Sequence, residues 1–145
     1  MTIIIWFVCT FGECQTETLT LSPEATAIAA CESGDTVTLG SFDWNAINVN
    51  RNKTIDTGAF QFNSYWVWSG DDTWVIAPVA SQYALSPSQF LMQYPTARDA
   101  PPNVQYAMFQ YLWNDGYGWQ HWSASRPCWS KWLTITKDNR AVFNQ

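Results

Sequence analysis

The four cysteines of this chain restrict its possible folds more than any other sequence feature. They are Cys9, Cys14, Cys31 and Cys128 in 145 residues. Four cysteines allow three disulfide pairings, and four reduced, buried thiols are a further alternative. Metal binding is disfavoured because there is no Cys-x-x-Cys spacing and His121 is the only histidine. We favour a short Cys9–Cys14 bridge and a long Cys31–Cys128 bridge, since closing the longer loop removes more entropy from the unfolded chain.

The first 21 residues are predicted to form a β-hairpin. Residues 16–21 are rich in β-branched side chains, and a turn at Phe11-Gly12 would place Cys9 opposite Cys14. The apolar run 3–11 also has the length of a signal-peptide core, but no basic residue precedes it and no small-x-small site follows. It is too short to span a bilayer. A folded N-terminal extension and a weak signal-like segment both stay open, and no transmembrane segment is expected.

The composition excludes some classes of function. Apolar residues make up 47% of the chain and charged residues only 13%, with a net charge of −5. Intrinsic disorder is therefore not expected, and a nucleic-acid partner is disfavoured because such proteins present a basic surface. The ten tryptophans are more than a small core easily holds. Because a buried indole N–H needs a partner, we expect some of them to line a surface groove.

The order of helix and turn signals predicts an α+β fold, mainly helical, with a small β-hairpin region and terminal β-hairpins. One helix is expected to begin at Ser22-Pro23 and stop at Gly34, a second runs from 86 to about 94, and a third runs from Pro101-Pro102 to Gly116. Residues 35–63 predict a small irregular sheet with short strands at 46–49 and 59–62. Periodicity leaves residues 65–80 undecided between strand and helix, and residues 131–145 predict a short hairpin or tail.

Glu32 is the first candidate catalytic residue. It falls in the last turn of the first predicted helix. The negative end of the helix dipole disfavours a charged carboxylate there, and apolar neighbours would disfavour it further. Both effects raise the pKa of the carboxyl, which is what a general acid near neutral pH requires. The competing interpretation is an ordinary solvated glutamate.

Four motifs follow one another along the chain. They are Ala30-Cys31-Glu32-Ser33-Gly34, Ala46-Ile47-Asn48, Gly58-Ala59-Phe60-Gln61-Phe62 and Gly118-Trp119-Gln120-His121-Trp122, the last continuing to Cys128. In this order they resemble the lysozyme-like superfamily, most nearly the transglycosylase-like domains of resuscitation-promoting factors and secondly c-type and phage lysozymes. The resemblance covers about residues 22–130, and it implies a single lysozyme-like domain with an N-terminal extension at 1–21 and a tail at 131–145.

The resemblance implies roles for particular residues. Glu32 matches the catalytic acid that protonates the glycosidic oxygen. Asp56 matches the second carboxylate of c-type lysozymes, and Gln61 matches a glutamine that contacts the substrate. Cys31 and Cys128 match a bridge that ties the catalytic helix to the C-terminal segment.

The assignment of Asp56 as the second carboxylate has alternatives. Asp56 follows Glu32 by 24 residues, a longer gap than in c-type lysozymes. Lytic transglycosylases work with a single acid, so Asp56 is also open to interpretation as a turn residue before Thr57-Gly58. Asp43 is the spare candidate. Hydrolysis and transglycosylation both stay open, because the separation of the two carboxyl groups is not known from the sequence.

Aromatic side chains are candidate sugar contacts, since their flat faces match the apolar faces of pyranose rings. Tyr65 and Trp66 follow Gln61 and Asn63 closely. Trp119 and Trp122 precede Cys128 by a few residues, and His121 between them is expected to be a surface or core residue. Core packing is the alternative for every one of these aromatics. The candidate substrate-binding residues are Gln61, Asn63, Tyr65, Trp66, Trp119 and Trp122.

The sequence thus predicts a peptidoglycan-degrading glycosidase, either a muramidase or a lytic transglycosylase, that needs no cofactor and no metal. Its partner would be the glycan strands of the cell wall, and it would act outside the cell, secreted or carried by a virion or another assembly. Two alternatives remain. One is a non-catalytic glycan-binding or virion structural module on the same fold, and the other is a chitinase-like activity on a related β-1,4 glycan.

Overall fold

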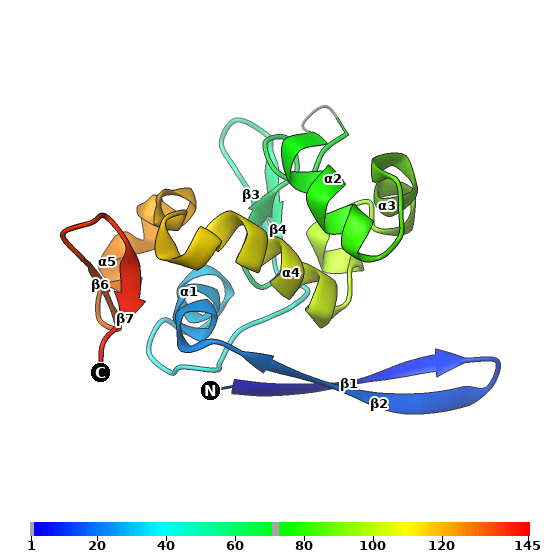
Figure 1. Ribbon diagram of the computed structural model, residues 1–145, viewed down its shortest axis with the longest axis horizontal. Coiled ribbons are helices and arrows are strands. Elements are labelled where there is room, and N and C mark those ends of the chain that lie inside the picture. Colours follow the sequence, from blue (N-terminus) through cyan, green and yellow to red (C-terminus); the bar gives the residue numbers. More distant parts are fainter. Residues whose placement is uncertain (1, 71–72) are drawn as a thin grey trace.

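The computed structural model describes residues 2–70 and 73–145, and it combines helices with small antiparallel sheets, an α+β architecture (Figure 1). The helices are α1 (Pro23–Ser33), α2 (Thr73–Gln82), α3 (Pro87–Gln93), α4 (Pro102–Trp113) and α5 (Arg126–Trp129). The strands are β1 (Thr2–Thr10), β2 (Glu13–Leu21), β3 (Ile47–Val49), β4 (Ile55–Thr57), β5 (Phe62–Asn63), β6 (Leu133–Ile135) and β7 (Ala141–Phe143). Single turns of 3₁₀ helix lie at η1 (Ala97–Asp99) and η2 (Asn114–Gly116), and a longer stretch lies at η3 (Trp119–Ser125).

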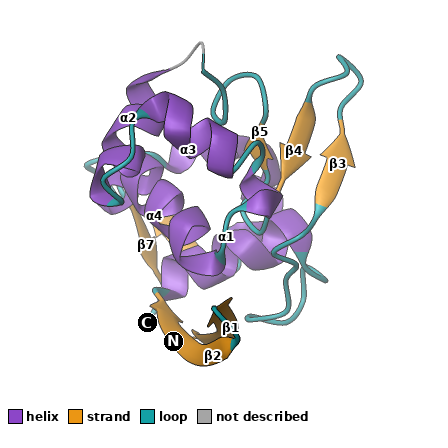
Figure 2. Ribbon diagram, turned by 90° about the vertical axis from the view of Figure 1, so that its right-hand side faces the viewer, coloured by secondary structure: helices purple, strands orange, loops and turns teal. Residues whose placement is uncertain are grey.

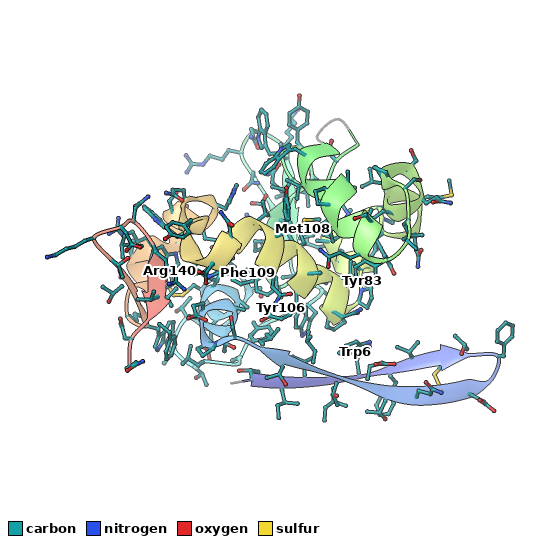
Figure 3. All side chains as sticks on the ribbon, in the orientation of Figure 1. Trp6, Tyr83, Tyr106, Met108, Phe109 and Arg140 are labelled. Carbon is teal, nitrogen blue, oxygen red and sulfur yellow. A yellow bond between two sulfur atoms is a disulfide. The ribbon has the colours of Figure 1, made fainter. Side chains whose placement is uncertain are left out.

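The β1–β2 hairpin extends away from the helical body (Figure 1). Its register pairs Cys9 with Cys14 across the Phe11-Gly12 turn, as predicted. Because successive side chains of a strand point to opposite faces, Ile3, Ile5 and Phe7 share one face of the hairpin, and all three are largely exposed. The other face turns Trp6 toward the body (Figure 3).

Helix α1 begins and ends where the sequence predicts. The Ser22 hydroxyl accepts a hydrogen bond from the Ala25 N–H at 3.1 Å, and Pro23 occupies the first turn. At the other end the Gly34 N–H bonds the Ala30 carbonyl. The chain passes so closely there that a Cβ on Gly34 would lie 1.8 Å from the Ser41 carbonyl oxygen. Glycine at this point lets the loop after α1 fold back beside the helix end, next to Glu32.

Strands β3, β4 and β5 form the predicted small sheet in that order (Figure 2). The strand expected at 59–62 was wrong, because only Phe62 of that run is a strand residue. Gly58 and Gln61 have φ angles of +81° and +52°, which are left-handed conformations that no extended strand contains. The run is a tight turn, and a Cβ on Gly58 would lie 2.4 Å from the Gln105 Oε1.

In the undecided segment 65–80, residues 65–70 form turns and bends, and α2, which contains Pro78, begins at Thr73, while residues 71 and 72 lie outside the described residues. The helix predicted from Ser86 is α3, with the Ser86 hydroxyl accepting a hydrogen bond from the Gln89 N–H. Helix α4 begins after Pro101 as predicted, but it ends at Trp113 and not at Gly116. Asn114 takes the left-handed conformation there (φ 45°), and asparagine tolerates it better than most residues.

Helix α4 is the centre of the core. Met108 and Phe109, both labelled in Figure 3, are fully or almost fully buried. The Phe109 ring stacks on Phe60 with ring centroids 4.6 Å apart. Gln105 is the fully buried polar residue of this helix. Its amide accepts from the Ala59 N–H at 2.9 Å and donates to the Trp44 and Ala100 carbonyls at 3.1 and 3.0 Å. This side chain therefore joins the sheet region to α4 within the apolar core.

The C-terminal hairpin β6–β7 forms as predicted for residues 131–145, with Leu133 and Ala141 buried against the body. The part of the chain that the structure describes contains no helix long and apolar enough to cross a membrane.

Candidate active site

Residues from α1, the small sheet, the end of α4 and η3 meet around a hollow of about 230 Å³, which we call the Glu32 cavity. These segments are far apart in the chain, and the tertiary fold brings them together. The cavity is lined by Glu32, Asp56, Phe60, Gln61, Phe62, Asn63, Val67, Leu112, His121, Trp122 and Ala124.

Glu32 contributes its carboxyl group from the last turn of α1. Burial raises the pKa of this carboxyl to about 7, because removing water disfavours the charged form. A hydrogen bond from Ser125 opposes the rise in pKa, and the nearby negative charge of Asp56 adds a smaller contribution to it. The carboxyl is therefore substantially protonated at neutral pH, as the sequence argument for Glu32 expected.

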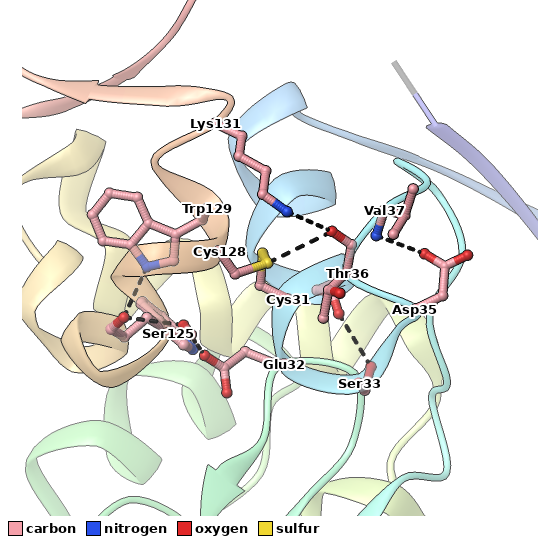
Figure 4. The surroundings of a disulfide bond; sticks show 12 residues. Cys31, Glu32, Ser33, Asp35, Thr36, Val37, Ser125, Cys128, Trp129 and Lys131 are labelled. Atoms are coloured by element: carbon pink, nitrogen blue, oxygen red, sulfur yellow. Dashed lines mark hydrogen bonds between the residues drawn. A yellow bond between two sulfur atoms is a disulfide. The ribbon is translucent and has the colours of Figure 1, made fainter.

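Ser125 is the closest partner of Glu32 and was missed by the sequence analysis. Its hydroxyl donates to Glu32 Oε1, and it also lies 3.1 Å from the carbonyl oxygen of Trp122 (Figure 4). The two residues are 93 positions apart, so no local pattern links them. The available signal was that Ser125 stands three residues before Cys128.

The disulfide Cys31–Cys128 fastens the end of α1 to α5 beside this contact (Figure 4). Cys9–Cys14 closes the tip of the β1–β2 hairpin. Both predicted pairings are confirmed, so the interpretations of the cysteines as reduced thiols or metal ligands are wrong. The described residues hold no cluster of three or more histidine, cysteine, aspartate or glutamate side chains suited to a metal.

Asp56 faces the same cavity from β4. Its neighbours in the sheet are Asn48 on β3 and Asn63 on β5. Asn63 Nδ2 donates to Asp56 Oδ1 at 2.7 Å, and Asn50 Nδ2 donates to Oδ2 at 2.9 Å. Two amides thus hold both carboxylate oxygens, which fixes the orientation of the side chain. Asp43 is placed differently, since its carboxylate accepts from the Asn45 N–H in a loop and does not line the cavity.

Gln61 and Asn63 line the cavity as expected. The Gln61 side chain is anchored to the Gly58 carbonyl at 3.0 Å. Asn63 Oδ1 accepts from the backbone N–H groups of Tyr65 and Trp66 at 3.0 and 3.1 Å. One asparagine therefore orients Asp56 and shapes the turn that follows β5.

The candidate aromatic residues differ in whether they line the Glu32 cavity. Trp122 lines the cavity and is held by its Nε1, which donates to the Phe60 carbonyl at 3.0 Å. Tyr65 and Trp66 are 57% and 62% exposed and pack against each other outside the lining of the cavity. Trp119 is not brought to the cavity, because it lies against Trp129 and under Arg126.

His121, which was expected to be a surface or core residue, also lines the cavity. Burial lowers its pKa, so the imidazole is neutral at pH 7. Its ring lies edge-on to Trp122 and stacks on Trp74.

Comparisons of this chain with protein-family models, curated proteins and solved structures found no match. The chemistry of the site must therefore be argued from its geometry. A protonated carboxyl in a partly apolar cavity can donate a proton, and a second carboxylate that lines the same cavity can stabilise positive charge that develops beside it.

Proposed function

We propose that the chain is a glycosidase that cleaves the β-1,4 bond between MurNAc and GlcNAc in peptidoglycan. The observation that carries the proposal is the Glu32 carboxyl, which burial keeps protonated near neutral pH at a cavity shared with Asp56. Acid-catalysed cleavage of a glycosidic bond needs such a proton donor beside the bond. The motif resemblance to lysozyme-like domains supplies the substrate class, and the two disulfides favour action in an oxidising compartment.

Glu32 is the general acid in this proposal. Its carboxyl proton passes to the glycosidic oxygen as the C–O bond breaks. Water or a hydroxyl of the sugar itself then bonds to the anomeric carbon, and the proton that this nucleophile releases returns to the Glu32 carboxylate. Ser125 serves both states of Glu32, because a hydroxyl has one proton to donate and lone pairs to accept. It donates to the Glu32 carboxylate in one state. In the other it accepts from the protonated carboxyl and donates to the Trp122 carbonyl.

Asp56 is the stabilising carboxylate. The transition state carries positive charge on the sugar ring, and a negative group fixed by Asn50 and Asn63 lowers its energy without having to reorganise. Gln61 and Trp122 line the cavity beside it, offering an amide for hydrogen bonds and an aromatic face for the sugar.

The proposal is tested by digestion of purified bacterial cell walls with the wild type and Glu32→Gln. Glutamine keeps the shape of the side chain but has no acidic proton, so we expect clearing of the walls to fall at least about a thousandfold. Glu24→Gln is the matched control, because it removes the other glutamate of α1 and should leave clearing unchanged. Equal clearing by wild type and Glu32→Gln would contradict the role of Glu32. No clearing by the wild type would favour a glycan-binding module.

A further inference from the structure

The β1–β2 hairpin divides its side chains between two faces of different chemistry. Side chains alternate along a strand, and residues paired across the two strands share a face. One face therefore carries a row of bulky apolar side chains on β1 beside a row of threonines on β2, and the disulfide continues it toward the tip. We call this the outer face, and its residues are Ile3, Ile5, Phe7, Cys9, Cys14, Thr16, Thr18 and Thr20.

The outer face is turned away from the rest of the molecule. Trp6 lies on the opposite face, is directed toward the helical body and lines a hollow there with Pro101 (Figure 3). Ile3, Ile5 and Phe7 are 65%, 61% and 73% exposed, and the other five residues of the outer face are exposed as well. Single exposed apolar residues need no explanation, but a contiguous apolar row on one surface marks an interaction site.

Charge is excluded from the outer face. The charged side chains of the hairpin are Glu13 and Glu17, and both lie on the opposite face with Trp6. The chain carries a net charge of −5, so two copies repel each other wherever their carboxylates come close. Contact through two outer faces brings no like charges together, and depletion of charge is typical of the core of a homodimer interface.

A lipid surface fits the outer face less well than a second copy of the chain does. Segments that bind membrane surfaces are rich in lysine and arginine. Residues 1–50 contain six acidic side chains and neither of these basic residues. The charge around the hairpin therefore opposes binding to an anionic membrane.

The two rows of the outer face are complementary to each other in size. In a two-fold dimer the same patch of both subunits forms the interface. A two-fold axis that runs along the hairpin, between two stacked outer faces, places β1 of one copy over β2 of the other. The bulky Ile5 and Phe7 of each copy then pack on the smaller threonines of its partner. Stacked sheets lie about 10 Å apart, and the two helical bodies are on opposite sides of the stack.

The outer face has the size and the rigidity that a weak dimer requires. Strands of nine residues make it about 30 Å long. Two stacked copies would bury on the order of 1,000 Å² in total, which is the lower limit for a specific interface. The Cys9–Cys14 bridge fixes the hairpin before association, so little conformational entropy is lost when the faces meet.

We infer that the chain forms a symmetric dimer in which the outer faces of two β1–β2 hairpins stack on each other. The small area predicts a dissociation constant in the micromolar range. The inference does not depend on the proposed function, because the outer face shares no residue with the lining of the Glu32 cavity.

Sedimentation velocity of the full chain between about 1 µM and 1 mM tests the inference. The wild type should pass from 16.5 kDa to twice that mass as its concentration rises. The double variant Ile5→Thr/Phe7→Thr removes the bulky row with residues that still favour strands, and it should weaken the dimer at least about tenfold. Val8→Thr makes the same kind of change on the opposite face and is the matched control. Mass spectrometry of the Cys9–Cys14 bridge shows that the hairpin still forms in each variant.

A wild type that stays monomeric at about 1 mM would overturn the inference. Equal dimerisation of Ile5→Thr/Phe7→Thr would also overturn it, because the contact would then lie elsewhere. Assemblies larger than a dimer would contradict it too, since two stacked faces form a closed pair. If a monomeric wild type binds phosphatidylcholine vesicles and the double variant does not, the outer face belongs to a lipid surface instead.

Failure of this inference is distinguishable from failure of the proposed function. A protein that clears cell walls as a monomer keeps the proposed function and loses the dimer. A protein that dimerises through the outer face and leaves walls intact keeps the dimer and loses the proposed function.

Discussion

Glu32 is the proposed general acid, and the protonation state of its side chain depends on burial. Its pKa of about 7 means that the acid form declines as the pH rises through neutrality. A general acid must be protonated to act, so we expect kcat/KM on soluble glycan fragments to fall tenfold per pH unit above about 7. Measuring the rate from pH 5 to 9 checks this, and a rate that stays constant through pH 8 would contradict the assignment.

The same burial affects folding stability. The pKa of Glu32 is raised from 4.5 in the unfolded chain to about 7 in the fold, so its ionisation opposes folding. Its contribution is fully present below pH 4.5 and is lost as the pH rises to about 7. Because glutamine does not ionise, Glu32→Gln should gain about 3 kcal/mol in free energy of unfolding relative to wild type between pH 4 and 8. Denaturant unfolding at several pH values measures the difference, and a constant difference would show that Glu32 is not buried as described.

Ser125 adjusts the acidity of Glu32. Its hydrogen bond to the carboxylate favours the charged form, so removing the hydroxyl should raise the pKa of Glu32. We therefore expect Ser125→Ala to move the alkaline limb of the pH–rate profile to higher pH, while Ser125→Thr restores it. The Trp122 carbonyl keeps its bond from Trp129 Nε1 in both variants, so the local fold has support without the serine. A purely structural role would lower the rate at every pH and leave the limb in place.

The Gln105 side chain connects two elements of the fold, the sheet region and α4. It is fully buried, and replacing it with leucine leaves the Ala59 N–H and two carbonyls without their partner. We expect Gln105→Leu to cost about 3 kcal/mol in free energy of unfolding. Gln110→Leu on the exposed face of the same helix is the control and should be nearly neutral. The free energies of unfolding are measured with denaturant. Similar losses of stability in the two variants would show that the buried hydrogen bonds of Gln105 do not account for its effect.

The first residue of a helix could be predicted from the sequence where neighbouring residues determine it. Ser-Pro pairs placed the beginnings of α1 and α3, because the cap and the fixed φ of proline act within one turn. The turn at 58–61 was not predictable from residue preferences. The run Ala59-Phe60-Gln61-Phe62 has strand-like composition, and its conformation depends on Gln105, 46 residues away from Ala59. Glu32, Asp56 and Gln61 could be picked out as site residues, whereas Ser125 became visible only through its tertiary contact with Glu32.

The two disulfides should contribute unequally to the stability of the whole molecule. Cys31–Cys128 spans 97 positions and Cys9–Cys14 spans five. Loop-closure entropy predicts a stabilisation of about 5 kcal/mol for the long bridge and about 2 kcal/mol for the short one. Thermal unfolding of the two double-alanine variants compares them. Equal losses of stability would contradict this ranking.

The long bridge also bears on activity. It holds the end of α1, with Glu32, against the segment that carries Ser125. We expect its removal to lower activity at temperatures where the protein is still folded, whereas the hairpin bridge lies away from the cavity and its removal should leave activity intact. Rates for the two variants well below their unfolding temperatures test this, and equal rates would show that the long bridge acts on stability alone.

The net charge of the molecule gives it no attraction to an anionic cell wall. Under the proposed function, a net charge of −5 gives no electrostatic steering toward peptidoglycan, so we expect contact to depend on uncharged sugar contacts or on a carrier such as a virion.

Mass spectrometry of purified peptidoglycan after digestion is the sharpest test of Glu32 as the acid of a glycosidase. We expect wild-type protein to release fragments with new glycan ends at MurNAc, which are reducing ends if water attacks and anhydro ends if the sugar's own hydroxyl attacks. We expect Glu32→Gln to release neither kind of end. Intact glycan strands after wild-type treatment, or the same ends produced by Glu32→Gln, would contradict that assignment.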